Sequence, residues 1–170
     1  MAWRINDGVL GRQGITEVSD TKRHAYGTLV KAVDETYGEG EFVYVQGCSG
    51  GGVGLLAYYN FSTGVTAMTS TSGVVNHGNP VGVMVSALDA TTDFGWLQIS
   101  GDAVIKKTAV KYDPAGNRGV FLSATAGRIM QTSVASRRVL GARWAATTTI
   151  TSTTSTAVIT IQRPHQQSAP

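Results

Sequence analysis

The stretch YVQGCSGGGVGLLAYY, residues 44–59, decides between two folds. Its segment Gly47-Cys48-Ser49-Gly50-Gly51 has the G-x-S-x-G spacing of a hydrolase nucleophile elbow, in which a strand turns sharply into a helix beside the oxyanion hole. Four of the five residues after Ser49 are glycines, and each glycine inside a helix costs about 1 kcal/mol relative to alanine. A helix therefore cannot begin there, and we predict a flexible loop between two strands, with no catalytic role for Ser49 or Cys48.

The composition is that of a turn-rich β protein. The chain has 170 residues, enough for one domain with its own core, and it combines 21 glycines and 15% charged residues with short runs rich in Val, Ile, Thr and Tyr. A single cysteine leaves no partner for a disulfide within the chain. Because the first residues lack a continuous apolar segment and no later run approaches about 18 apolar residues, we expect no secretion signal and no membrane partner.

From residue 41 onward, strand-like runs alternate with turn-forming clusters such as NHGNP and DPAGN. The runs cover residues 41–46, 53–59, 80–88, 94–101, 102–112, 119–124, 138–145 and 156–163. We predict a mainly β fold, a compact antiparallel β-barrel or sandwich of the β-tulip or jelly-roll kind. The threonine-rich run 147–156 reads as the tip of a hairpin, because threonine forms strands well and the run leads into alternating apolar residues.

The two ends of the chain differ from this central region. Residues 1–37 hold isolated apolar residues among glycines and charges, so we expect an extended N-terminal arm that packs either on a partner or on its own barrel. The β domain is expected to cover residues 38–163. Residues 164–170 are polar and are expected to form a frayed tail.

No residues group into a catalytic or metal-binding pattern. His24, His77 and His165 are far apart, without the spacing of metal ligands. Asp89, Asp93 and Asp113 fall in predicted turns, where aspartate commonly bonds its own backbone; we expect these roles rather than acid–base catalysis. The prediction is a protein that is not an enzyme and has neither cofactor nor metal.

Nucleic-acid binding is a separate possibility, because the chain carries a formal net charge of +3. Its basic clusters are short and dispersed, whereas a binding face normally groups Lys and Arg or interleaves them with aromatic residues. Trp96 and Trp144 lie within strand-like alternation, which indicates a core or a subunit interface. We expect no nucleic-acid partner.

Charge is distributed unevenly along the chain. Acidic residues gather in the first quarter, whereas every charged side chain after Asp113 is an arginine. The two ends can form separate solvated faces, or they can attract one another within a subunit or between subunits.

The order of several segments resembles the decoration, or cement, proteins of tailed-bacteriophage capsids. The resemblance covers residues 25–165 and is carried by GTLVKAVDETYGEGEFVYVQG (27–47), PVGVMVSALDATTDFGWLQISGDAVIKK (80–107), DPAGNRGVFLSATAGRI (113–129), RVLGARW (138–144) and TAVITIQRP (156–164). The glycine-rich CSGGGVG loop departs from the pattern, and residues 1–24 carry little of it. The resemblance implies a small β-rich structural protein, often trimeric, that binds the major capsid protein on the outer surface of the virion and stabilises the lattice.

This interpretation gives the arm and the C-terminal arginines a role at an interface with the capsid or with other subunits. The candidate interface residues are Trp3, Arg4, Ile5, Val9, Leu10, Arg12, Ile15, Arg137, Arg138 and Arg143. The alternatives are a carbohydrate-binding or adhesin module, which would expose aromatic residues on one face, and a serine hydrolase that uses Ser49.

Overall fold

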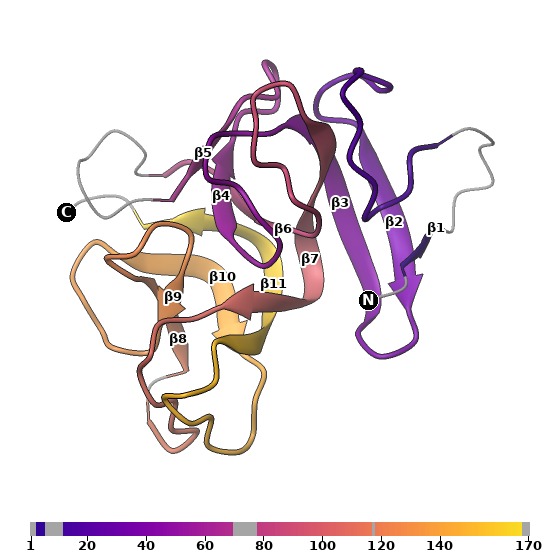
Figure 1. The fold of residues 1–170 in the computed structure, drawn as a ribbon. Helices are drawn as coiled ribbons and strands as arrows, with labels where there is room; N and C mark the ends of the chain where they lie inside the picture. The colour runs from indigo at the N-terminus through magenta and orange to yellow at the C-terminus, as the bar shows by residue number, and fades with distance from the viewer. Residues whose placement is uncertain (1–2, 6–11, 70–77, 117, 168–170) are drawn as a thin grey trace.

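The computed structural model describes residues 3–5, 12–69, 78–116 and 118–167. In these ranges the chain forms strands joined into a single sheet, and no helix (Figure 1). The strands are β1 (Arg4–Ile5), β2 (Leu29–Asp34), β3 (Gly38–Gln46), β4 (Leu56–Tyr59), β5 (Thr66–Met68), β6 (Val81–Met84), β7 (Phe94–Lys106), β8 (Gly119–Leu122), β9 (Ile129–Met130), β10 (Arg138–Trp144) and β11 (Thr156–Gln166). All pairs among these strands are antiparallel, which confirms the predicted class.

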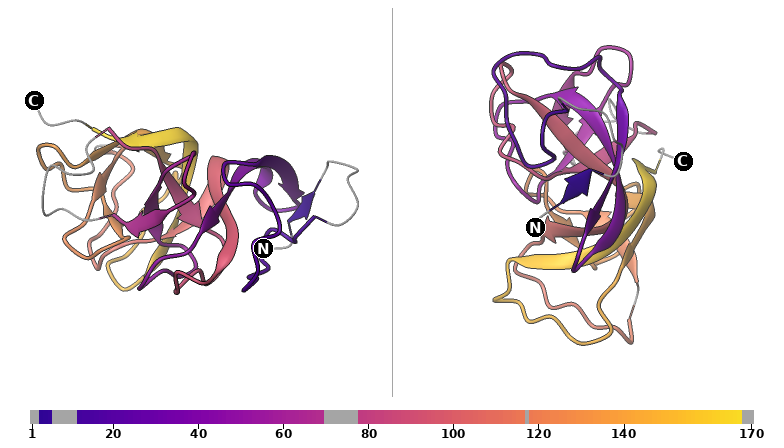
Figure 2. Two further views of the ribbon diagram at one scale, coloured as in Figure 1. Left: turned by 90° about the horizontal axis from the view of Figure 1, so that it is seen from above. Right: turned by 90° about the vertical axis from the view of Figure 1, so that its right-hand side faces the viewer.

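The main path of the sheet runs β1-β2-β3-β7-β11-β10-β8-β9, and β6, β4 and β5 branch from the first half of β7. The β2–β3 hairpin lies at one end of the molecule and β8 to β10 at the other, with β7 between them (Figure 2).

Strand β7 joins the two parts because it changes partner along its length. Its first half pairs with β3, its second half pairs with β11, and Ser100 has a partner on each side. At this point Ile99 is an extra residue relative to β3, and Gly101 has a φ of +95°. The sequence predicted two separate strands divided after residue 101. That division was wrong, because the bulge and the glycine redirect one continuous strand.

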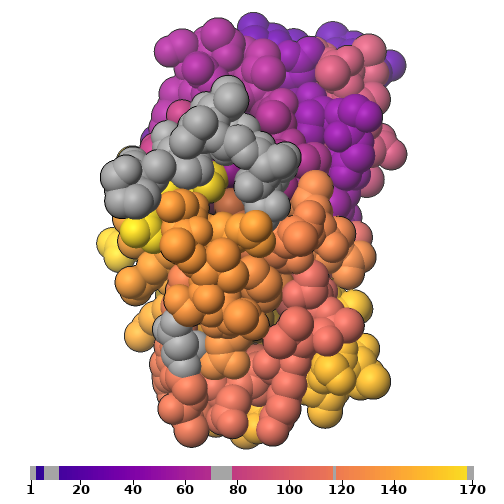
Figure 3. Space-filling view, turned by 90° about the vertical axis from the view of Figure 1, so that its left-hand side faces the viewer, coloured from indigo at the N-terminus to yellow at the C-terminus, as the bar shows by residue number. Residues whose placement is uncertain are grey.

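The second part of β7 belongs to a barrel. β4, β6, β7, β11, β10 and β8 surround the largest buried cluster, in which Tyr112 stacks on Trp144 with ring centroids 4.6 Å apart. The turn between β8 and β9 links back to β4, since Gly127 O accepts a hydrogen bond from Leu56 N at 2.9 Å. Figure 3 shows this end of the molecule, with the orange surface of the β8 to β10 region across its middle.

Two further clusters lie on the two faces of β3 and the first half of β7. One contains Val43, Leu97, Ile99 and Met84. The other contains Phe42, Tyr44, Val30 and Trp96, and it is covered by residues of the N-terminal segment. Trp96 and Trp144 are both core residues, at 0% and 1% exposure.

Gln13 ties the N-terminal segment to the sheet. Its side chain is fully buried and donates to Phe94 O at 2.9 Å and to Glu17 O at 2.8 Å, while its Oε1 accepts a hydrogen bond from Tyr44 at 3.0 Å. Its backbone carbonyl accepts from Trp96 Nε1, and its backbone N–H donates to Nε2 of His24 at 3.2 Å. Each polar group of this buried residue therefore has a partner, which is the condition under which burial is not destabilising.

The expected domain boundaries require correction at both ends. A boundary at residue 37 falls in the turn of the β2–β3 hairpin, so residues 29–34 belong to the sheet. The expected tail begins inside β11, where Gln166 is buried and bonds to the hydroxyl of Tyr58. The threonine-rich run does form the tip of the β10–β11 hairpin, with a turn from Thr151 to Thr154.

The glycine-rich loop is a loop, as predicted, but it is fixed rather than flexible. Gly47 N donates to Asp93 O at 2.7 Å, Cys48 N to Leu88 O at 3.2 Å, and Gly54 N to Met84 O at 2.8 Å. A Cβ atom on Gly51 would overlap the carbonyl of Leu88. The glycines therefore permit close backbone packing.

Replacing Gly101 by alanine should destabilise the protein more than the same change at Gly50. Both residues have positive φ, but only at Gly101 would the new Cβ overlap a backbone atom, the carbonyl oxygen of Glu39. We expect a loss of about 1 kcal/mol for Gly50→Ala and roughly 3 kcal/mol for Gly101→Ala, measured by urea denaturation. Equal losses at the two sites would show that the close approach to β3 is unimportant.

Acid should weaken the attachment of the N-terminal segment. Burial, together with the charges of Arg12 and Arg23, lowers the pKa of His24 below 6.5, so the folded state favours the neutral ring that accepts from Gln13. The stability that this supplies is present above pH ~6.5 and is lost as the pH falls through the lowered folded pKa. Amide hydrogen exchange of residues 12–24 should therefore accelerate between pH 7.5 and pH 5, after correction for intrinsic rates.

The matched controls are His24→Gln, which should abolish this acceleration, and His165→Gln, which changes an exposed histidine and should preserve it. An acceleration that persists in His24→Gln would assign the effect to another group.

Candidate interaction surface

An exposed trough crosses the sheet from β2 to β10, and we refer to it below as the trough. Three adjoining hollows form it, with volumes of about 280, 460 and 340 Å³. The first two share Lys31 and Glu41, and the second and third share Gln162. The residues that define the trough are Leu29, Lys31, Glu39, Glu41, Ser100, Gln162, Arg163, Thr160, Gly141 and Arg143.

Strand alternation explains why these side chains share one face. Lys31 pairs with Glu41, Glu41 with Ser100, and Ser100 with Gln162, so one row crosses four strands. Residues in register on neighbouring strands point to the same side of a sheet. Thr160 and Arg143 form the next row toward β10. The opposite face of β11 and β10 carries Ile159, Ile161 and Trp144 into the barrel.

Ion pairs occupy the centre of the trough. Nζ of Lys31 lies 3.4 Å from Glu39 and 3.9 Å from Glu41, and Nη2 of Arg163 lies 3.3 Å from the other oxygen of Glu41. The Glu41 side chain is 27% exposed, whereas those of Lys31, Glu39 and Arg163 are more than half exposed. Exposed pairs contribute about 0 to 1 kcal/mol each, so this network shapes the surface more than it stabilises the fold.

The two ends of the trough differ in chemistry. At the β2 end Leu29 is 42% exposed, a large value for an aliphatic side chain. At the β10 end Arg143 is exposed, and it makes no ion pair within the part of the chain that the structure describes. Thr160, opposite Arg143, donates its hydroxyl to Asp102 at 2.7 Å.

The predicted interface residues form two groups in the structure, the C-terminal arginines and the N-terminal residues. Arg138 and Arg143 lie exposed on β10, but Arg138 lines a different hollow with Phe121 and residues 133–136. Arg137, just before β10, is half-buried, and its carbonyl accepts from Leu122 N.

The N-terminal candidates lie against the protein's own sheet. Trp3 contacts Phe42 edge-on with ring centroids 4.9 Å apart, and Ile5 packs on the same cluster. Ile15 is 2% exposed, and Arg12 is half-buried beside Gln13. Of the two expected placements of the arm, packing on its own domain is the one observed for these residues.

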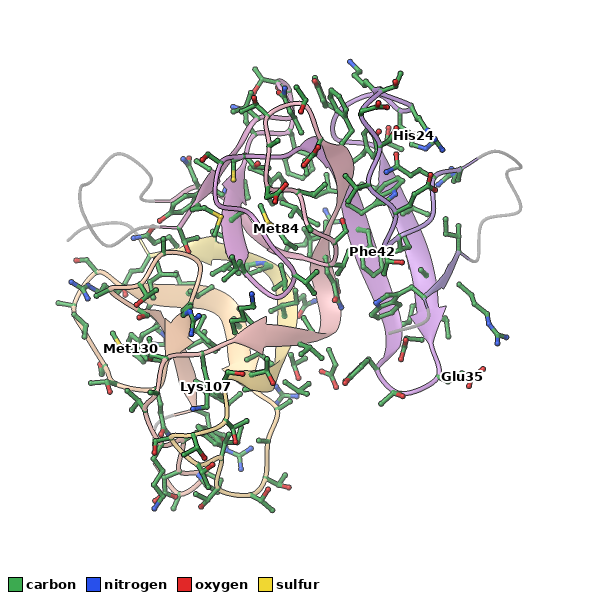
Figure 4. The ribbon with its side chains drawn as sticks, in the orientation of Figure 1. His24, Glu35, Phe42, Met84, Lys107 and Met130 are labelled. Carbon is green, nitrogen blue, oxygen red and sulfur yellow. The ribbon has the colours of Figure 1, made fainter. Side chains whose placement is uncertain are left out.

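Three further N-terminal candidates are Arg4, Val9 and Leu10. Arg4 pairs with Glu35 at 3.0 Å in full contact with solvent, at the hairpin end labelled by Glu35 in Figure 4. Val9 and Leu10 lie outside the described residues.

Charge attraction between the two ends of the chain occurs within the subunit. Arg163 meets Glu41, while the other described acidic residues of the first quarter that form ion pairs do so locally, in Glu17–Arg23, Glu35–Arg4 and Glu39–Lys31. These carboxylates therefore have intrachain partners.

The residues considered for catalysis lie apart from the trough. Ser49 is exposed on the loop beside buried Cys48, and Asp93 accepts from Ala90 N at 3.0 Å in the turn predicted for it. Asp113 likewise accepts from Ala115 N at 3.0 Å. His24 lies at the far end of the β2–β3 hairpin from Glu35 (Figure 4), and His77 is outside the described residues.

The described ranges lack both a metal-binding group and a membrane-spanning helix. No group of three or more His, Cys, Asp or Glu side chains suits a metal ion there. Those ranges also contain no helix with the length and apolar character needed to cross a membrane.

Lys107 is a buried basic residue that sequence reasoning missed. It is 1% exposed, and its Nζ donates to the carbonyls of Thr108 at 3.1 Å and Val110 at 2.9 Å, near the loops at the end of the barrel (Figure 4). Burial lowers the pKa of its ammonium group. Both bonds go to neighbouring backbone, so Lys107 fixes the chain as it leaves β7.

Sequence reasoning identified Arg143 but missed the rest of the trough. Lys31 and Glu41 lie on one hairpin, whereas Gln162 comes more than a hundred residues later, and only the sheet brings them together. The alternation of exposed and buried residues in β2 and β11 was the available signal.

Comparisons with protein-family profiles, with curated proteins and with solved structures gave no match.

Replacing Ser49 and Cys48 should have different effects. Ser49→Ala changes an exposed loop residue and should alter the free energy of unfolding by less than about 0.5 kcal/mol. Cys48→Ser puts a hydroxyl among Met84, Leu88 and their neighbours and should cost ~1 kcal/mol. Chemical denaturation measures both, and labelling of Ser49 by a fluorophosphonate probe would contradict the assignment of this segment as a structural loop.

Proposed function

We propose that this protein is a capsid decoration protein, which binds the outer surface of a tailed-bacteriophage head and stabilises its lattice. The observation that supports this most is the trough, an exposed sheet face with mixed charge, one apolar end and one arginine end. Such a face suits contact with another protein surface, where charge complementarity gives specificity. The segments that resemble decoration proteins also supply most of the strands that carry it.

The stabilising mechanism is thermodynamic linkage. A protein that binds the assembled lattice but not its dissociated subunits adds RT ln(1 + [L]/Kd) per site to the free energy of disassembly. When one decoration protein makes several contacts with the lattice, its overall affinity increases even if each contact is weak. The hydrogen-bonded loop, the Gln13 contacts and the continuous sheet suit a clamp that must keep its shape.

The homotrimer remains part of the proposal, and it now rests on the resemblance alone. Contacts between acidic N-terminal residues and a neighbour's arginines receive no support, because the paired carboxylates already have intrachain partners. Sedimentation of the purified protein tests the assembly. A stable species of 17.8 kDa at micromolar concentration would contradict a trimer that forms without the capsid.

Head binding tests the function directly. The purified protein should cosediment with expanded, DNA-filled heads from which decoration protein has been removed, and it should not bind free capsid subunits. Bound protein should also raise the temperature at which the heads release DNA. Failure to bind such heads from the phage that encodes the protein, or equal binding to free subunits, would contradict the proposal.

A further inference from the structure

We propose that the trough holds one extended segment of a partner protein, with an apolar side chain at the Leu29 end and an acidic side chain at the Arg143 end. The inference rests on the proposed function, because it names the chemistry of the capsid segment that the protein would hold.

The dimensions of the trough suit an extended chain. It crosses the five neighbouring strands β2, β3, β7, β11 and β10, which are spaced at about 4.8 Å, so its ends lie roughly 19 Å apart. An extended peptide rises about 3.3 Å per residue, so about six residues span that distance.

The two ends set what the segment must present. Leu29 offers exposed apolar surface beside Lys31, and covering it with an apolar side chain removes that surface from water. Arg143 offers a guanidinium that has no carboxylate partner among the described residues. A carboxylate is the partner that a guanidinium binds best, through two parallel hydrogen bonds.

The centre of the trough distinguishes a peptide from a nucleic acid. Lys31 and Arg163 already form ion pairs with Glu39 and Glu41, so a ligand needs no charged group at the centre of the trough. A nucleic acid would place several phosphates along the same path, against these two carboxylates. A peptide that is polar in its middle and acidic only at one end avoids this repulsion.

The inference can be tested with a defined probe. The probe is an acetylated and amidated peptide with leucine at one end, serine and threonine in the middle and two aspartates at the other end. Titrated into the isotope-labelled full-length protein, it should shift the backbone amide resonances of Lys31, Ser100 and Gln162. A peptide with asparagine in place of aspartate should bind roughly tenfold more weakly, and oligothymidylate of the same length should leave these resonances unchanged.

Matched variants separate the two ends of the trough from general effects of charge. Arg143→Glu should weaken binding of the acidic peptide roughly tenfold, whereas Lys111→Glu, an equal charge change at an exposed residue outside the trough, should not. Leu29→Ser should weaken it about fivefold, and Val110→Ser, at 39% exposure, should have no effect. A peptide ending in lysines should restore binding to Arg143→Glu.

Several results would overturn the inference. These are resonance shifts confined to residues outside the trough, equal weakening by Arg143→Glu and Lys111→Glu, and competition by oligothymidylate. Circular dichroism confirms that each variant is folded, and Arg143→Gln, which removes charge without reversing it, should give an intermediate loss.

Head binding distinguishes failure of this inference from failure of the proposed function. If heads bind the wild type and Arg143→Glu equally well, the protein decorates capsids through another surface and the inference is wrong. If the peptide binds as expected but heads do not bind, the trough is a peptide site and the capsid function is wrong.

Discussion

The structure depends on the change of partner at the middle of β7. Ile99 is the extra residue of a bulge, and Gly101 brings β7 so close to the carbonyl of Glu39 that no side chain fits. Here β3 ends its pairing with β7 and β11 begins. One strand can therefore belong to a hairpin sheet at one end and to a barrel at the other. The trough crosses the strands at this junction, so the same bend places Glu41 beside Gln162 and Arg163.

The N-terminal segment shows how a stretch without local periodicity becomes ordered. Gln13 satisfies all its polar groups inside the protein, through contacts with β3, β7 and its own segment. Around it, His24, Tyr44 and Trp96 form a set of mutually inclined aromatic rings. Long-range hydrogen bonds to one buried amide therefore order this segment, although it lacks the periodic apolar residues that predict a helix or a strand.

Much of the fold could be predicted from the sequence because antiparallel strands leave a local signal. The runs at 119–124 and 138–145 each contain a strand of the structure, and the runs at 41–46 and 156–163 lie within longer strands. The turns at Asp93 and Asp113 have the expected side-chain bonds. The prediction was wrong where the local sequence favours one structure and the tertiary contacts favour another. Gly101 was interpreted as a strand end, although its neighbours on two strands keep it in the sheet.

The trough was less predictable than the fold, for a physical reason. β2 was included in the arm by the boundary at residue 37, although buried Val30 and Ala32 alternate with outward-facing Leu29 and Lys31. Arg143 was identified from the run of C-terminal arginines. The residues that complete the surface are polar and ordinary in sequence, and only the register of the sheet shows that they are neighbours.

The position of β11 has a consequence for how the protein is made. It is the last strand in sequence, yet it lies inside the sheet between β7 and β10, and it contributes Ala157, Ile159 and Ile161 to the main core. During synthesis the barrel cannot form until β11 has left the ribosome, and β7 and β10 expose unpaired edges until then. Folding thus requires pairings between distant segments, which makes it slow, and a nascent chain stalled before residue 156 has no stable barrel. The same order makes completion of the domain depend on synthesis of β11, so products truncated before β11 lack the strand that lines the middle of the trough.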